Sequence, residues 1–175
     1  MPCDRRGWLG EIALLAGDYE AAAGYLRDAC AALEANTNVL ELSTYASRGR
    51  ALCALGRFDE AESLAIQGRE LGADDDPFTQ ALWRQVAAIV KASRGDYAEA
   101  ETLAREAVDR TAQTDLPGLQ ANALCDLAEV LETAGRRDEA VAAWQEALDR
   151  YERKQIIQLA RRVRERLAAI QDTAI

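Results

Sequence analysis

Residues 93–110 read SRGDYAEAETLAREAVDR, and the phrase that begins at Gly95 recurs along the chain. Related phrases are GDYEAAAG from Gly17, GRFDEAES from Gly56 and GRRDEAVA from Gly135. Successive glycines are 39, 39 and 40 residues apart. A fixed period across a whole chain is typical of stacked repeats, because one short unit cannot bury its apolar face without a neighbour.

One period predicts two helices joined by a tight turn. Asp76 and Pro77 suit the start of a helix, since an Asp side chain accepts free amide hydrogens there and proline fits the first turn. Apolar residues then recur at helical spacing as far as Gly95, and glycine readily takes the left-handed conformation that ends a helix. Helix pairs are expected at residues 4–16 with 19–35, 39–55 with 58–72, 77–94 with 97–112, and 117–134 with 137–153.

Matching positions around each turn define the repeat. An aromatic residue follows three of the four glycines by two positions, and an alanine follows every glycine by five. We interpret these aromatic residues, together with Trp8, Trp83 and Trp144, as packing residues. The repeat-defining residues are Gly17, Tyr19, Ala22, Gly56, Phe58, Ala61, Gly95, Tyr97, Ala100, Gly135 and Ala140. Small residues seven positions before each glycine should let the helices of a pair approach closely; they are Gly10, Gly49, Ala88 and Ala128.

These motifs, with Leu9-Gly10 in the first helix, resemble tetratricopeptide repeats over nearly the whole chain. The repeat unit of that family is usually about 34 residues long, so each unit here is longer, and the proline that usually closes the unit is missing. The resemblance implies an all-α, right-handed superhelical solenoid of four helix-turn-helix repeats. The repeats are expected at about residues 4–35, 39–72, 77–113 and 117–153, in a single domain spanning residues 1–175.

The two ends of the predicted stack differ. Residues 156–172 have an apolar stripe with arginines elsewhere, which predicts a C-terminal helix that caps the stack. The first helix is apolar nearly all round, through Leu9, Ile12, Leu14 and Leu15, and no cap precedes it. We expect an upstream repeat, another domain or a second copy of the chain to pack on it.

The second half of the chain also resembles the C-terminal repeats of large actinobacterial proteins. Those proteins join a nucleotide-cyclase domain, or a transcription-activation module, to an ATPase that precedes the repeats. The resemblance implies that the chain is a fragment or a detached tail of a larger bacterial signalling regulator. The cyclase and ATPase chemistry would then lie outside residues 1–175.

Composition argues against several classes of function. The chain has 30 acidic and 21 basic residues, a formal net charge of −9, and a nucleic-acid partner is not expected without a basic face. The basic run at residues 150–166 is interpreted as a solvated last helix, the alternative being an anionic partner site. Histidine is absent and no phosphate-binding or nucleophile motif occurs, so we predict no enzyme activity, no catalytic or metal-binding residue and no cofactor.

The cysteines and the chain start indicate a cytoplasmic protein that does not bind membranes. No two of the four cysteines form a CxxC pair, and those in helical runs are interpreted as reduced core residues. They are Cys3, Cys30, Cys53 and Cys125. Neither a signal peptide nor a membrane-spanning run occurs.

The first helices of the repeats are expected to line a concave groove. Aligning the repeats on their glycines puts polar and apolar residues in matching inward rows, which could hold an extended peptide or a helix. The candidate groove residues are Glu11, Ser43, Arg50, Leu82, Gln85, Asn122 and Glu129. An ordinary polar surface without a dedicated ligand is the alternative interpretation.

Three functions remain open at this stage. The first is a non-catalytic protein-interaction module in the regulatory region of a bacterial signalling protein, with a protein or peptide partner. The second is a sensor that binds a small molecule or peptide in the groove. The third is self-association through Leu9, Ile12, Leu14 and Leu15, as a homodimer or by docking to upstream domains.

Overall fold

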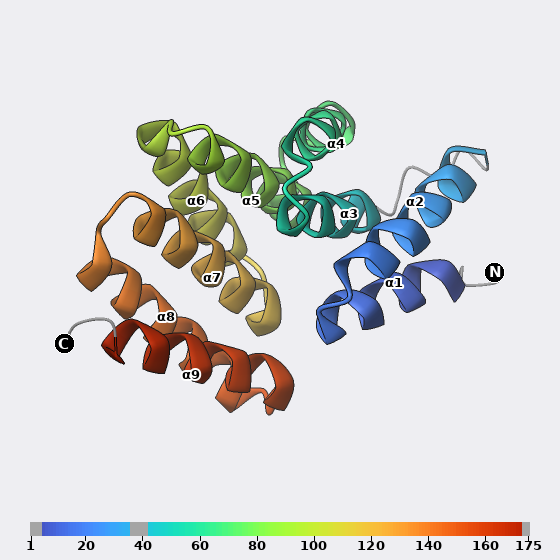
Figure 1. Ribbon diagram of the computed structural model, residues 1–175. Coiled ribbons are helices and arrows are strands. Elements are labelled where there is room, and N and C mark those ends of the chain that lie inside the picture. The colour runs from blue at the N-terminus through green and yellow to red at the C-terminus, as the bar shows by residue number, and fades with distance from the viewer. Residues whose placement is uncertain (1–4, 36–41, 173–175) are drawn as a thin grey trace.

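The computed structural model describes residues 5–35 and 42–172, which form nine α-helices and no strand (Figure 1). The expected helix starts at Asp4 and Val39, and Cys3, lie outside these ranges. The helices are α1 (Arg5–Ala16), α2 (Tyr19–Ala35), α3 (Leu42–Ala54), α4 (Phe58–Leu71), α5 (Pro77–Ser93), α6 (Tyr97–Thr111), α7 (Pro117–Thr133), α8 (Arg137–Arg153) and α9 (Ile157–Asp172).

Consecutive helices pack as hairpins, and the hairpins stack into a curved array. The first helices of neighbouring hairpins also contact one another, α1 with α3, α3 with α5 and α5 with α7. Figure 1 shows that the array follows a C-shaped arc, which brings α9 round toward the first hairpin. The predicted all-α repeat solenoid is confirmed, and its concave face is the inner side of this arc.

The local signals read from the sequence act as predicted. All four turn glycines have positive φ, from +72° at Gly56 to +83° at Gly95. At the start of α5, the Asp76 carboxylate accepts hydrogen bonds from the backbone amides of Phe78 and Thr79, at 3.1 and 3.3 Å. The start of α5 and the four turns therefore form where local chemistry favours them.

Small residues allow close helix packing, although not always between the expected helices. The alanines five residues after each turn glycine are fully buried. A Cβ on Gly10 would lie 2.4 Å from Leu26 Cγ in the hairpin partner α2, as predicted. A Cβ on Gly49 would lie 2.9 Å from Val86 Cγ1, which belongs to α5 in the next repeat. This second glycine therefore serves the contact between repeats rather than the hairpin.

Two aromatic residues are more exposed than predicted. Trp144 is buried as expected, but Trp8 is 63% exposed and Tyr97 is 41% exposed. α1 packs mainly against α2 and α3, and the Trp8 side chain is largely exposed to solvent. Tyr97 is the first residue of α6, directly after the turn at Gly95 and Asp96.

The C-terminal helix packs as the sequence predicts. α9 lies against α8 and buries Ala160, Val163 and Ile170 on its apolar stripe. In addition, the Arg162 guanidinium donates a hydrogen bond to the Leu15 carbonyl at the end of α1. α9 therefore closes the stack and also links it to the first hairpin. None of the described helices is both long enough and apolar enough to cross a membrane.

Candidate functional site

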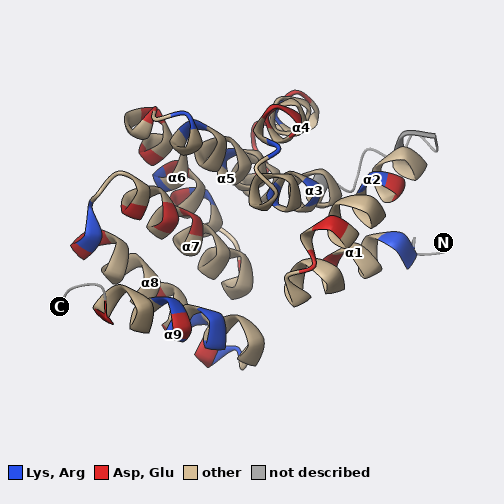
Figure 2. Ribbon diagram, in the orientation of Figure 1, with Lys and Arg blue, Asp and Glu red and all other residues tan. Residues whose placement is uncertain are grey.

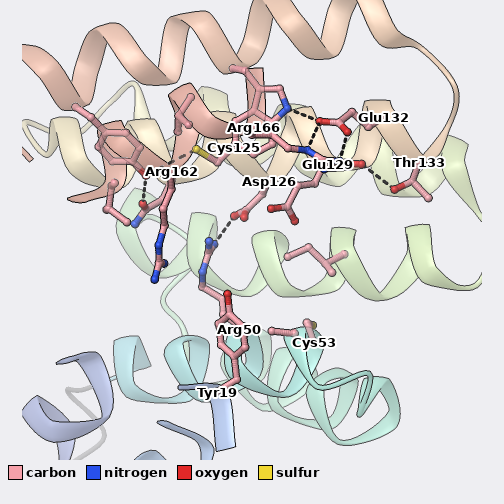
Figure 3. Close-up of a pocket in the computed structure, with 17 residues that line it drawn as sticks. Tyr19, Arg50, Cys53, Cys125, Asp126, Glu129, Glu132, Thr133, Arg162 and Arg166 are labelled. Carbon is pink, nitrogen blue, oxygen red and sulfur yellow. Dashed lines mark hydrogen bonds and ion pairs between the residues drawn. The ribbon is translucent and has the colours of Figure 1, made fainter. Parts of the chain in front are cut away.

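A cavity of about 600 Å³ opens on the concave face, between α3, α5, α7 and α9 (Figure 3). Its apolar lining includes Ile89 from α5 and Leu159 and Val163 from α9. Its polar lining comes chiefly from α3, α7 and α9. Because the groove is formed by helices from different repeats, the cavity exists only when the array has curved.

An ion pair between Arg50 and Asp126 crosses this cavity. Arg50 Nη1 on α3 lies 2.5 Å from Asp126 Oδ2 on α7. The Asp126 side chain is 1% exposed, whereas that of Arg50 is 28% exposed. The second carboxylate oxygen, Asp126 Oδ1, is buried and has no hydrogen-bond partner among the described residues. The Asp126 carboxylate therefore retains an unused acceptor inside the cavity wall.

Glu129 lies one helical turn after Asp126 on the same face of α7. Figure 3 shows both carboxylates directed from α7 toward the space that Arg50 enters from α3. Among the described residues, none forms an ion pair or a hydrogen bond with the Glu129 carboxylate. Glu129 is accessible to solvent, but the surrounding protein partly desolvates its carboxylate. This desolvation, together with repulsion from Asp126, raises the pKa of Glu129 to about 7.

The Arg50–Asp126 pair shows the balance between burial and attraction. Burial raises the pKa of the Asp126 carboxyl, and the nearby Arg50 guanidinium only partly offsets this effect. Burial by itself would lower the pKa of Arg50, but attraction to Asp126 and Glu129 raises it above its ordinary value. Arg50 is therefore a permanent cation, held by two carboxylates of which only one is hydrogen-bonded to it.

A neutral hydrogen-bonded group lies deeper in the cavity. The Tyr151 hydroxyl donates to Asn122 Oδ1 at 2.5 Å and lies 3.8 Å from Cys125 Sγ. Burial raises the pKa of Tyr151 above its ordinary value and raises the pKa values of Cys53 and Cys125 to about 12. These thiols are protonated at neutral pH, so neither is poised to act as a nucleophile.

The arginines of α9 have different partners on its two sides. Toward the cavity, Arg166 pairs with Glu132, whose carboxylate also accepts a 2.5 Å hydrogen bond from Trp144 Nε1. Away from the cavity, Arg161 pairs with Glu165 on the same helix. Figure 2 shows this mixture of charges along α9 and the acidic residues along α7. Arg162 and Arg166 are exposed, as expected for a solvated helix, and they also line the cavity.

Three of the seven sequence-predicted groove residues line the cavity, namely Arg50, Asn122 and Glu129. The remaining four lie elsewhere. Leu82 is buried in the core with Val86, and Gln85 is 2% exposed. Glu11 and Ser43 are half-buried and lie outside this cavity. Gln85 Nε2 has no hydrogen-bond partner among the described residues.

Asp126, Tyr151 and Arg162 line the cavity but are not among the groove residues predicted from the sequence. The sequence could have indicated Asp126 as a buried charged residue, because it is the single acidic residue within the run ANALCDLA of α7. Tyr151 and Arg162 lie on second helices or the cap, outside the rows expected to face the groove. Within the described ranges, no group of three His, Cys, Asp or Glu side chains could hold a metal ion.

The fold and the cavity define an all-α helical-repeat protein with a concave binding surface. Family models described as tetratricopeptide repeat match residues 42–74, which contain α3 and α4, and residues 78–153, which contain nearly all of α5 to α8. These matches cover more than half of the chain, so the chain belongs to the tetratricopeptide-repeat family. Repeats of this family generally mediate protein–protein interaction. No curated protein sequence matches the chain closely enough to count as a relative.

Proposed function

We propose that this chain is a non-catalytic protein-interaction module that binds an extended segment of a partner protein in the concave cavity. The observation that carries the proposal is the cavity itself, where unused polar groups of α7 face an apolar lining from α5 and α9. Its volume of about 600 Å³ suits several amino-acid side chains. Residues Arg50, Asn122 and Glu129 would contact the bound segment.

The setting that we propose is the C-terminal regulatory region of a cytoplasmic bacterial signalling protein. The resemblance of the second half of the chain to the repeats of cyclase- and ATPase-containing regulators supports this setting. In such a protein, the module would bind a protein partner or hold an output domain inactive. Residues 1–175 would then form one repeat domain of a longer polypeptide.

A peptide-display selection on the immobilised chain tests the proposed function. Ala54 is exposed and lines the cavity at the end of α3, so Ala54→Trp should fill part of the groove without disturbing the core. Ala142 is an exposed alanine on α8 outside the cavity, so Ala142→Trp is the matched control. Selected peptides should bind the parent chain and the control equally, and the Ala54→Trp variant at least tenfold more weakly. A selection without binders, or binders indifferent to Ala54→Trp, would refute the proposal.

A ligand-sensing role is the second candidate, and the contacts across the groove favour it. Arg50 joins α3 to α7, and Arg162 joins α9 to the end of α1. A small molecule or peptide that competed for either arginine would loosen one of these links and change the curvature of the array. Small-angle scattering with and without a selected peptide would detect such a change, whereas identical profiles would argue against sensing.

Self-association through α1 is the third candidate. Trp8, Leu9, Ile12 and Leu15 are large apolar residues that α1 leaves exposed, whereas Leu14 packs against the core. Two copies of such a stripe could cover each other about a two-fold axis. Sedimentation velocity should show a dimer that Ile12→Asp dissociates. Ile66 is also exposed but lies on α4, so Ile66→Asp should leave the dimer intact; a monomeric parent chain would exclude this candidate.

A further inference from the structure

Two acceptors on the α7 side of the cavity have no partner among the described residues. Glu132 is satisfied by Arg166 and Trp144, and one oxygen of Asp126 is satisfied by Arg50. The Asp126 Oδ1 atom and the Glu129 carboxylate have no partner among the described residues. When both carboxyl groups are ionised, Arg50 is hydrogen-bonded to Asp126 and not to Glu129.

A buried acceptor without a hydrogen bond is uncommon, because burial removes the water that would otherwise satisfy it. Asp126 is 1% exposed and its free oxygen is shielded from solvent, but the residue belongs to the cavity wall beside the exposed Glu129. Arg162 is the remaining arginine of the cavity lining, but it donates to the Leu15 carbonyl and makes no described ion pair with either carboxylate. No ion pair or hydrogen bond within the described residues therefore supplies the missing donor.

We propose that the space in front of Asp126 and Glu129 is a subsite for a positively charged side chain, arginine or lysine, of a bound protein segment. This inference rests on the proposed function, because the cation arrives as part of that segment. An anionic group would fit poorly, since Arg50 and Arg166 are already paired while the two acceptors are free.

The shape and lining of the cavity support a long cationic side chain. A guanidinium group has donors in a planar fork, so it could bond to the exposed Glu129 carboxylate through two of them, with its charge beside Asp126. The aliphatic stem of arginine or lysine could lie on the apolar lining that Cys53 and Ile89 provide. The added positive charge would lie beside the Asp126 and Glu129 carboxylates, which Arg50 alone does not satisfy.

Binding at this subsite should depend on pH. The charged groups that face Glu129 are Arg50 from α3, Asp126 and Glu132 from α7, and Arg166 from α9. Burial and the two carboxylates raise the pKa of Glu129 to about 7, although the two arginines act in the opposite direction. A bound cation favours the ionised carboxylate, so binding below this pKa must release a proton. The affinity for a cation should then fall by up to about tenfold for each pH unit below 7.

Short peptides of known charge test the subsite in the full chain. Acetylated, amidated pentapeptides Ala-Ala-Xaa-Ala-Ala would carry arginine, lysine, citrulline or norleucine at Xaa, and amide chemical shifts would follow titration into the ¹⁵N-labelled protein. Citrulline has nearly the shape of arginine but no charge. Arginine and lysine peptides should shift amides of α3 and α7, and citrulline and norleucine peptides should bind at least tenfold more weakly.

The substitution Glu129→Gln tests whether Glu129 causes the preference for the arginine peptide over the citrulline peptide. Glu129→Gln should remove the preference for arginine over citrulline and its pH dependence between pH 8 and 6. Glu70 is exposed on α4 and makes no described ion pair, so Glu70→Gln should keep both. Equal binding of the arginine and citrulline peptides, absence of shifts on α7, or a preference that survives Glu129→Gln would overturn the inference.

The outcomes also separate this inference from the proposed function. If selected peptides bind in the groove but need no basic residue, the groove binds protein segments and the cation subsite is wrong. If the arginine pentapeptide binds in a Glu129-dependent way but no display peptide depends on the groove, the subsite is correct and the proposed function is wrong.

Discussion

Arg50 and Asp126 form a 2.5 Å ion pair although 76 residues separate them and α5 lies between their helices in the stack. The pair therefore connects the second repeat directly to the fourth. In a repeat protein, most contacts are made between adjacent units. A contact that skips a unit constrains the curvature of the array, and here it crosses the proposed binding cavity.

Removal of Arg50 should destabilise the fold in a pH-dependent way. Arg50→Met leaves the buried Asp126 carboxylate without its cation, which should lower the free energy of unfolding by about 3 kcal/mol at pH 8. The pKa of Asp126 in the folded state should then rise further above its unfolded value. Because the folded state would hold the proton more tightly, stability should fall as pH rises from 5 to 8. Urea unfolding at both pH values measures this.

Arg94→Met is the control for that experiment, because Arg94 also pairs with carboxylates but does so at the surface. Its removal should lower the free energy of unfolding much less than removal of Arg50, because solvent screens an exposed ion pair. If Arg50→Met lowers the free energy of unfolding only slightly, or by the same amount at pH 5 and 8, then Arg50 does not stabilise the ionised Asp126 carboxylate.

Glu129→Gln should stabilise the chain at high pH. The pKa of Glu129 in the folded state, about 7, lies above its ordinary value, so the ionised carboxylate opposes folding. Stability should therefore fall as pH rises from the ordinary pKa through 7, and Gln should remove this fall. The thermal midpoint of Glu129→Gln should exceed that of the parent chain at pH 8 but not at pH 4. Equal midpoints at pH 8 would contradict the raised pKa.

The cavity cysteines should resist alkylation in the folded protein. With pKa values of about 12, Cys53 and Cys125 are thiolates to the extent of about one part in ten thousand at pH 8. Iodoacetamide at pH 8 should label them in urea but not in buffer, as measured by peptide mass mapping. Rapid labelling of either cysteine in buffer would mean that the cavity opens on the time scale of the reaction.

Two glycine substitutions should have opposite effects on stability. A Cβ on Gly10 would meet Leu26 Cγ at 2.4 Å, so Gly10→Ala should destabilise the fold by about 1–3 kcal/mol. A Cβ on Gly24, within α2, would meet no atom within 4 Å. Gly24→Ala should therefore stabilise the chain by about 0.5–1 kcal/mol, since alanine favours a helix. Urea unfolding compares the two variants, and a neutral Gly10→Ala would refute the close approach of α1 and α2.

The helices and turns could be predicted from the sequence because local chemistry decides them. Gly95 ends α5 through its own backbone conformation, and Asp76 starts that helix through its own side chain. The 39- to 40-residue period then requires that the hairpins stack, whichever partner the protein has. Where the prediction was wrong, as at Trp8, the error concerned which neighbour covers a face.

The candidate site could be predicted only in part. Alignment of the repeats identified Arg50 and Glu129 as inward-facing residues, because equivalent positions share one side of the first helix. The alignment treats all repeats as equivalent, so it could not predict that Gln85 is buried whereas Asn122 lines the cavity. Tyr151 and Arg162 lie on helices outside that alignment, and the curvature of the array brings them to the cavity.

The sequence by itself determined the helical hairpins, the repeat period and the stacking, because these depend on residues close together in the chain. Only the tertiary structure decided that Arg50 meets Asp126, that Arg162 meets Leu15, and that one oxygen of Asp126 is left without a partner. Those relationships depend on the angle at which each hairpin packs on the next. Small rotations at each interface add up along the array, so the contacts across the groove are set by all the repeats together.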